Sequence, residues 1–404
     1  MGDARDAVGP AGAGRIGSID GLRAAAFLAV FAFHTWEFAG HPSIPVVSFV
    51  IGQNIRPDFF VVLTGFVLFL PFARDERRLG RLAAGPWLRR RLRRIVVPYY
   101  VALAFAVLLP QALVALTRLA GRPSSWQPVP GLGAWVSHLT FTHLLFRDWW
   151  GSINGSLWTM SLEMQLYLLF PLLVLAVSRW GLRALAGAVV VSVLFRIGVA
   201  LVVAGPAFPD QFPWAASGLG RLMELAAGMA AAEVVFRHGW RPRRSATAAL
   251  VLAMGGLFTL ASWAAATDPV VPVRELALGG LFGSLVVLAS TVGAVTRLFA
   301  WRPLAVLGLR AYSLFLVHQP LAWYVSRGLR TFAGVDDGPL MLLLLWSVGL
   351  AVVLAVGLVF FRVVERPCIA WAKRLPVTAA PATGAQDESV LGGSGAAPVS
   401  DPAH

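Results

Sequence analysis

The sequence predicts an all-α fold, a polytopic membrane helix bundle of about ten transmembrane helices with both termini in the cytoplasm. Of the 404 residues, 57% are hydrophobic and only 13% are charged, and the mean hydropathy is +0.71. Soluble domains carry charged residues at about 25%. Apolar runs close to the roughly 20 residues that cross a bilayer recur along the chain. Arginines gather in alternate loops between these runs, as in multi-pass membrane proteins.

The apolar runs set the expected spans. They lie at residues 22–40, 57–73, 95–117, 158–178, 184–204, 214–236, 245–265, 275–295, 304–325 and 340–361. The run at 57–73 is short, and the amphipathic segment at 133–146 is either interfacial or re-entrant. We expect the membrane domain to cover 18–375. The Gly- and Ala-rich residues 1–17 and the Ala-, Gly-, Pro- and Ser-rich residues 376–404 predict disordered segments, the second of them cytoplasmic.

Arginine counts orient the spans relative to the membrane. The arginine-rich segments, which we place in the cytoplasm, are the loops at 74–94 and 237–244 and the tail after residue 361. The loops with at most one arginine each, which we place outside, are those at 41–56, 205–213 and 266–274. The loop at 118–157 carries three arginines and fits the alternation least well. This arrangement predicts a multi-pass protein of the cell inner (plasma) membrane.

Several other classes of protein are disfavoured by composition. The net charge of +14 does not indicate nucleic-acid binding, because the arginines flank apolar runs as membrane anchors do. The single cysteine, Cys368, excludes a disulfide framework and a cysteine-based metal site. His138 and His143 are five residues apart, which is not the spacing of a helical zinc pair, so no metal site is expected. Residues 1–17 lack an apolar core, so no signal peptide is expected.

The stretch at 18–37, SIDGLRAAAFLAVFAFHTWE, places ionisable side chains in the first apolar run. Arg23 and His34 are eleven residues apart, so on a helix they share one face and lie about 16 Å apart along the axis. We expect Arg23 at the membrane surface and His34 near mid-bilayer, where an ionisable group is costly and therefore a functional candidate. Glu37 follows His34 by three residues and can reach it along the helix.

Six stretches carry a further pattern. They are IDGLRAAAFLAVFAFH at 19–34, PDFFVVLTGFVLF at 57–69, RRRLRRIVVPYY at 89–100, SLWTMSLEMQLYLLFP at 156–171, LGLRAYSLFLVHQPL at 307–321 and VVERP at 363–367. In this order they resemble the motifs of the type 3 family of integral membrane acyltransferases, which includes bacterial O-antigen and other cell-surface O-acetyltransferases. Thr64 stands where that family usually has serine. The resemblance covers roughly residues 15–370.

The resemblance implies a membrane-bound O-acyltransferase. It would move an acyl group, with acetyl favoured, from acyl-CoA to a hydroxyl of a carbohydrate or a glycosylated small molecule. Acyl-CoA (acetyl-CoA) is then a donor substrate, and no bound cofactor is expected. His34 matches the family's histidine and would be the general base, which its ordinary pKa of about 6.5 suits. Arg91 and Arg94 match the family's arginine pair and would bind the donor's phosphates, unless they are only topology signals and lipid contacts.

The two acidic candidates for the site, Glu37 and Glu163, each allow a functional and a structural interpretation. Glu37 either orients His34, as the acid does in a catalytic triad, or faces the surface. Glu163, in the span that Trp158 opens, either positions substrate or belongs to a structural ion pair. Its candidate partners are the arginines inside other apolar runs, Arg196 and Arg221.

His318 and Glu365 match family positions in the last two stretches. Each is expected either to contact substrate or to make structural hydrogen bonds or ion pairs within the bundle. Arg23 shares the His34 face and is counted with the catalytic candidates.

A multi-span transporter or flippase of a cell-envelope precursor, without group transfer, is the alternative function. The sequence shows no repeated halves and no corresponding pair of broken helices, which favours the enzyme. The expected partners are acyl-CoA, a hydroxylated acceptor and the lipid bilayer, without nucleic acid. No fused extracytoplasmic domain is recognised, so we expect the protein to work alone or with a separately encoded extracytoplasmic partner.

Overall fold

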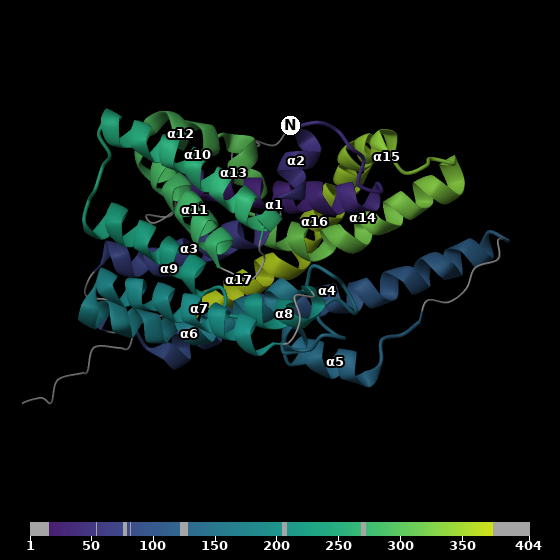
Figure 1. The fold of residues 1–404 in the computed structure, drawn as a ribbon. Coiled ribbons are helices and arrows are strands. Elements are labelled where there is room, and N and C mark those ends of the chain that lie inside the picture. Colours follow the sequence, from purple (N-terminus) through teal and green to yellow (C-terminus); the bar gives the residue numbers. More distant parts are fainter. Residues whose placement is uncertain are drawn as a thin grey trace, which may run out of the picture.

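The computed structural model describes residues 16–53, 55–75, 79–80, 82–121, 128–203, 208–267 and 272–374. Every element within these ranges is a helix, which confirms the all-α fold (Figure 1). The terminal segments predicted at 1–17 and 376–404 lie outside the described residues, apart from Ile16 and Gly17.

The chain folds into long helices with shorter helices between them. The long ones are α1 (Gly17–Phe38), α3 (Arg56–Arg74), α4 (Ala84–Leu119), α6 (Trp158–Trp180), α7 (Leu182–Val202), α10 (Arg244–Thr267), α11 (Val273–Thr291) and α14 (Ala311–Ala333). The shorter ones are α2 (Val47–Gly52), α5 (Leu132–Leu139), η2 (His143–Leu145), α8 (Phe208–Ala215), α9 (Leu222–Ala232), η3 (Glu233–Arg237), α12 (Gly293–Phe299), α13 (Arg302–Gly308), α15 (Pro339–Leu344), η4 (Leu345–Gly349), α16 (Leu350–Phe360), η5 (Phe361–Glu365) and α17 (Arg366–Lys373).

The described helices include seven that are long and apolar enough to cross a membrane, or eight if the bent pair α13–α14 is one span. The remaining two expected spans are at 22–40 and 214–236. The first is mostly α1, whose hydropathy is lowered by charged side chains such as Arg23, and the second is divided into the shorter helices α9 and η3 after the non-helical residues 216–221. The protein is therefore a multi-pass membrane protein. The count of ten spans and the cytoplasmic position of both termini stay predictions.

Helix α1 lies in the middle of the bundle (Figure 1) and packs against α3, α11, α12, α13 and α14. Leu22, Ala26 and Phe27 on this helix are fully buried. Because neighbouring helices cover so much of α1, its polar side chains face protein and internal space rather than lipid.

The span expected at 304–325 is two helices, α13 and α14, whose axes differ by 75°. Gly308 ends α13 against α1, and a Cβ at this position would lie only 1.7 Å from the carbonyl oxygen of Asp20. Glycine alone permits such an approach. The sequence did not predict this bend, because hydrophobic periodicity carries no information on how closely two backbones pack.

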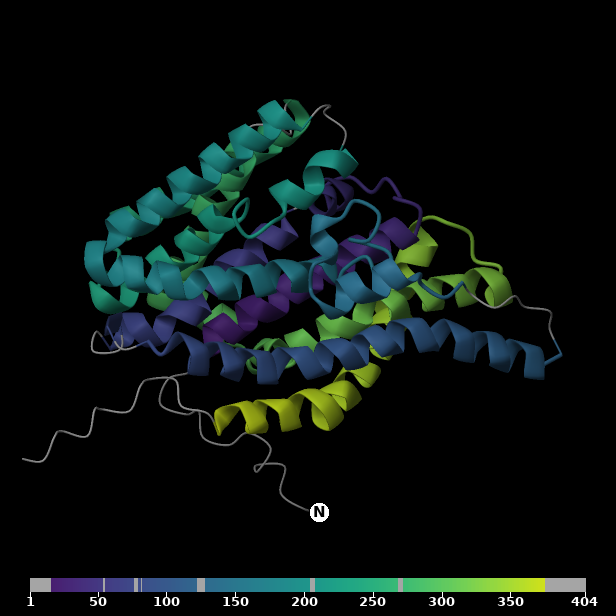
Figure 2. The same cartoon turned by 90° about the horizontal axis from the view of Figure 1, so that it is seen from below.

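The segment expected as an arginine-rich loop at 74–94 is helical in its second half, because α4 begins at Ala84. Arg91 and Arg94 are three residues apart and therefore share a face of α4. This helix is 36 residues long, and its C-terminal half extends beyond its neighbours (Figures 1 and 2). Figure 2 shows α17 alongside α4, with which it is in contact.

The outward faces of several long helices are apolar. Leu172 on α6 is 64% exposed, Leu194 on α7 is 62% exposed and Leu252 on α10 is 76% exposed. Lipid tails, unlike water, solvate such side chains at no cost, so these faces are the membrane-facing surface.

Candidate active site

A cavity of about 450 Å³ lies inside the bundle, a volume typical of small-molecule sites. It is lined by α1, α3, α4, α6, α14 and the segment before α6, and along α1 it reaches from Arg23 to Glu37. At 1.5 Å per residue this is about 21 Å. The predicted site residues that line it are Arg23, His34, Glu37, Arg91, Arg94, Trp158 and Glu163. The fold thus brings together residues from three separate stretches of sequence.

His34 and Glu37 form a hydrogen-bonded pair in the cavity wall. Nδ1 of His34 lies 2.8 Å from Oε2 of Glu37. An ionised carboxylate only accepts hydrogen bonds, so Nδ1 is the donor of this pair, and in a neutral imidazole Nε2 is then the nitrogen with the free lone pair. His34 lies only four residues before the end of α1 at Phe38. Its depth in the bilayer stays a prediction.

Arg23, Arg91 and Arg94 line the cavity together with Glu163, nearer the N-terminal end of α1. The hydroxyl of Tyr167 donates a hydrogen bond to Oε1 of Glu163. All three guanidinium groups are close enough to this carboxylate to interact with it electrostatically. Three positive groups around one lining carboxylate make this end of the cavity suitable for an anionic ligand.

Arg56 is a cavity residue that the sequence analysis missed. Its Cζ lies 3.3 Å from the centroid of the Phe33 ring, and its Nη1 donates to the carbonyl oxygen of Ile51 at 2.7 Å. Glu37 is also close enough to interact with it electrostatically. In the sequence, Arg56 counted only as the single arginine of an outer loop. The available signal was its position in the first turn of an apolar run, beside Asp58.

The chain before α6 forms another wall of the cavity, through Trp150, Ser156 and Trp158. The backbone N–H of Ser156 donates to Oε1 of Gln319 at 2.6 Å. The hydroxyl of Ser156 donates to Oδ1 of Asn154 at 2.8 Å. Gln319, which also lines the cavity, therefore ties this wall to α14.

His318 and Glu365 are fully buried and lie outside the cavity lining. The ring centroid of His318 is 5.4 Å from that of His34, and its Nδ1 lies 2.5 Å from the carbonyl oxygen of Phe315. Oε2 of Glu365 accepts from the hydroxyl of Ser313 at 2.5 Å and from its backbone N–H at 3.2 Å. These contacts favour the structural interpretation for both residues.

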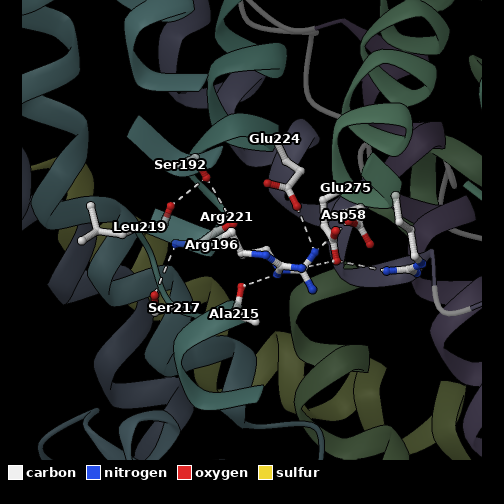
Figure 3. A network of polar contacts seen from close by, with 11 residues as sticks. Asp58, Ser192, Arg196, Ala215, Ser217, Leu219, Arg221, Glu224 and Glu275 are labelled. Carbon is white, nitrogen blue, oxygen red and sulfur yellow. Dashed lines mark hydrogen bonds and ion pairs between the residues drawn. The ribbon is translucent and has the colours of Figure 1, made fainter. Parts of the chain in front are cut away.

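Arg196 and Arg221 do not pair with Glu163, so that expectation was wrong. Nη1 of Arg221 lies 2.7 Å from Oδ1 of Asp58 and 2.9 Å from Oε1 of Glu224, and Nη2 of Arg196 lies 3.0 Å from Oε1 of Glu275. Figure 3 shows these side chains converging from α3, α7, α9 and α11. Helix contacts rather than sequence order decide the pairing. The network connects four helices beside the cavity.

The ambiguous segment at 133–146 forms α5 and η2. The rings of His138 and His143 stack 4.0 Å apart, and the hydroxyl of Tyr99 donates to the carbonyl oxygen of His138 at 3.1 Å. Burial, and then repulsion from His143, lower the pKa of His138 to about 4. Burial also lowers the pKa of His143. Within the described ranges, no group of three or more His, Cys, Asp or Glu side chains is arranged to hold a metal ion.

Two curated proteins illustrate what the chain is similar to. The peptidoglycan O-acetyltransferase OatA of Listeria monocytogenes is 24% identical over 329 residues, which cover 75% of this chain and 49% of the relative. The acyltransferase MdmB of Streptomyces mycarofaciens is 27% identical over 403 residues, which cover 91% of this chain and 95% of the relative. The chain thus spans about half the length of the first relative and nearly all of the second. No solved structure matches it.

The family comparison covers all the cavity-lining motifs. A family model described as an acyltransferase domain matches residues 16–362, from the first turn of α1 to the last π-helical turn. The match includes His34, Glu37, Arg91, Arg94 and Glu163. The chain therefore belongs to this acyltransferase family.

Proposed function

We propose that the protein is an O-acyltransferase of the plasma membrane that moves an acyl group, acetyl first of all, from acyl-CoA to a hydroxyl of a carbohydrate or a glycosylated small molecule. The observation that carries this proposal is one cavity lined both by the His34–Glu37 pair and by Arg23, Arg91 and Arg94. Membership of the acyltransferase family supports acyl transfer. The name of the Listeria relative supports a carbohydrate acceptor.

The arginines support an anionic donor. Guanidinium groups bind phosphate through paired N–H donors, and acyl-CoA carries its phosphates far from its reactive carbonyl carbon. The donor's phosphates would bind near Arg91 and Arg94, with Arg23 beside them. Glu163, which accepts a hydrogen bond from Tyr167, neutralises only part of the charge of these three arginines.

The His34–Glu37 pair supports removal of a proton from the acceptor. Nε2 of His34 takes the hydroxyl proton while the hydroxyl oxygen attacks the thioester carbonyl carbon, and Glu37 stabilises the imidazolium that forms. The tetrahedral intermediate then breaks its C–S bond. The imidazolium returns the proton to the leaving CoA sulfur, which leaves the ester product and free CoA.

The cavity wall near His34 supports an acceptor with apolar and hydroxylated faces. Phe33, Trp150 and Phe212 line it together with polar groups of Ser156 and Gln319. Aromatic rings present flat apolar surface to the ligand, and a few polar groups fix its orientation.

Purified protein in detergent tests the proposal directly. Wild-type protein is given acetyl-CoA and a panel of chitooligosaccharides, muropeptides and glycosylated macrolides, and mass spectrometry reads the products. His34→Ala should lower kcat by about 10²–10⁴-fold, while His238→Ala, at an exposed histidine away from the cavity, should not. A folded His34→Ala protein with more than a tenth of the wild-type rate would refute the base assignment.

A matched pair of double variants tests the donor site in the same assay. Arg91→Ala with Arg94→Ala should raise the KM for acetyl-CoA, because it removes binding shared by ground state and transition state. Arg89→Ala with Arg93→Ala removes the same charge from the same helix at positions outside the cavity lining. If the two double variants have equal KM values for acetyl-CoA, Arg91 and Arg94 only set the orientation of the helix in the membrane and do not bind the donor.

A further inference from the structure

We propose that the side-chain amide of Gln319 is the hydrogen-bond donor for the thioester carbonyl oxygen when that oxygen becomes negatively charged. This inference rests on the proposed function, since it assigns a further catalytic residue to the same reaction. It follows from the position of Gln319 on α14, from the hydrogen bond that its carbonyl oxygen accepts, and from the four hydroxyl groups of the cavity that already donate to other groups.

Gln319 lies on the cavity face of α14 and level with His34. Ala311, Phe315 and Gln319 all line the cavity and are four residues apart, as expected for one face of a helix. His318, the residue before Gln319, has its ring centroid 5.4 Å from that of His34. Gln319 and His34 thus line the same cavity, and the residue that precedes Gln319 lies next to His34.

The hydrogen bond to Ser156 orients the Gln319 amide. Oε1 accepts from the backbone N–H of Ser156 at 2.6 Å, so the NH₂ group lies on the other branch of the amide. A Cβ on Gly155 would lie 3.0 Å from Nε2, so glycine gives the amide room. In the described part of the chain, no residue accepts a hydrogen bond from Nε2. The two N–H donors remain available to a ligand in the cavity.

Of the five hydroxyl-bearing residues that line the cavity, all but Thr64 already donate a hydrogen bond within the described part of the chain. The hydroxyl of Tyr167 donates to Glu163 and that of Tyr312 to the carbonyl oxygen of Ile95. The hydroxyl of Ser156 donates to Asn154 and that of Thr159 to the carbonyl oxygen of Ser156. A hydrogen-bond donor stabilises a charge that exists only in the transition state most effectively when it is already fixed in position and donates to no other group. The Gln319 amide meets both conditions.

The role adds one hydrogen bond to the reaction and changes no covalent step. As the acceptor oxygen bonds to the carbonyl carbon, the carbonyl π electrons move onto the carbonyl oxygen, and an N–H of Gln319 donates to that oxyanion. When the C–S bond breaks, the electrons return and the hydrogen bond weakens.

Gln319→Glu separates the catalytic role from a structural one. The carboxylate keeps an oxygen to accept from Ser156 but has no N–H to donate. We expect kcat for thiol release from acetyl-CoA to fall about 10²–10³-fold, as for loss of one oxyanion donor, with KM values within threefold of wild type. The new negative charge near His34 should also move the acidic limb of the kcat/KM pH profile to higher pH.

Two further variants keep the test decisive. Gln165→Glu is the matched control, because Oε1 of Gln165 also accepts from a backbone N–H, that of Gly218 at 2.8 Å, and Gln165 does not line the cavity. It should leave kcat within threefold of wild type. If Gln319→Glu does not fold, Gln319→Met replaces it, and a folded Met variant should lose kcat with unchanged KM for the donor.

The outcomes distinguish this inference from the proposed function. If the wild type transfers acetyl groups and depends on His34, a folded Gln319→Glu protein with kcat within threefold of wild type overturns the inference alone. The same conclusion follows if Gln319→Met raises KM and lowers the melting temperature while Gln319→Glu is unaffected. A wild type that never releases thiol from acetyl-CoA overturns both.

Discussion

Removing Arg221 should destabilise the protein strongly, because this side chain neutralises two buried carboxylates. Its Nη1 lies 2.7 Å from Oδ1 of Asp58 and 2.9 Å from Oε1 of Glu224, and both carboxylates are fully buried (Figure 3). Arg221→Met keeps most of the side-chain volume but leaves two negative charges near each other without their shared partner. Breaking a buried ion pair in this way costs about 3–5 kcal/mol of unfolding free energy.

Neutral partners should recover much of that loss. In the triple variant Arg221→Met, Asp58→Asn, Glu224→Gln, no uncompensated charge remains in the network, and replacing a whole buried ion network is often close to neutral. Asp337→Asn is a control for an exposed pair, since Asp337 contacts Arg330 with its side chain 54% exposed. Such pairs are worth about 0–1 kcal/mol.

Equilibrium unfolding in detergent, followed by tryptophan fluorescence, gives the unfolding free energies. The 15 tryptophans provide the signal. An Arg221→Met protein within 1 kcal/mol of the wild type, well below the expected cost of an unpaired buried charge, would refute the reasoning. So would a triple variant no more stable than Arg221→Met.

Two more predictions concern packing and pH. Gly65→Ala and Gly228→Ala should each lower the melting temperature by several degrees. A Cβ at Gly65 would lie 2.2 Å from the carbonyl oxygen of Leu225, and one at Gly228 would lie 2.0 Å from that of Val62. Gly255→Ala on α10 is the control and should not lower it, because the space around Gly255 is open. Between pH 7 and pH 5 the unfolding free energy should fall by about 2 kcal/mol. In the folded protein the pKa of His138 is about 4, whereas in the unfolded chain this histidine binds its proton near pH 6.5. Acid between these two values therefore favours the unfolded chain. His138→Phe should remove the part of this dependence that His138 contributes, and a flat wild-type profile over that range would contradict the buried histidine pair.

Contacts within one helix were the part of the site that sequence reasoning could predict. The helical period alone places Glu37 beside His34 and puts His34 on the same face as Arg23. It also puts Arg91 and Arg94 on a common face, although the helix that carries them was expected to begin later. Local geometry decides these relations, so no knowledge of the tertiary fold is needed.

Contacts between helices were not predictable in the same way. Asp58 and Arg221 are 163 residues apart in the chain, and only the packing of α3 on α9 makes them partners. Arg56 was overlooked for a related reason, since its burial depends on Phe33 from another helix. The bend after Gly308 likewise follows from contact with α1. Each depends on which backbones meet, which hydropathy does not encode.

The two groups of buried charge differ in a way that bears on function. The network of Figure 3 is balanced, with three arginines and three acids: Arg196, Arg221, Arg274, Asp58, Glu224 and Glu275. The described lining of the cavity has an excess of positive charge, because it has four arginines and only two glutamates: Arg23, Arg56, Arg91, Arg94, Glu37 and Glu163. A balanced set needs no ligand, whereas an excess of positive charge between apolar walls attracts an anion. An anion held near Arg23 must also present its reactive carbon about 16 Å away, at His34. A thioester on a long flexible arm can span this distance, which is why acyl-CoA is the donor that we propose.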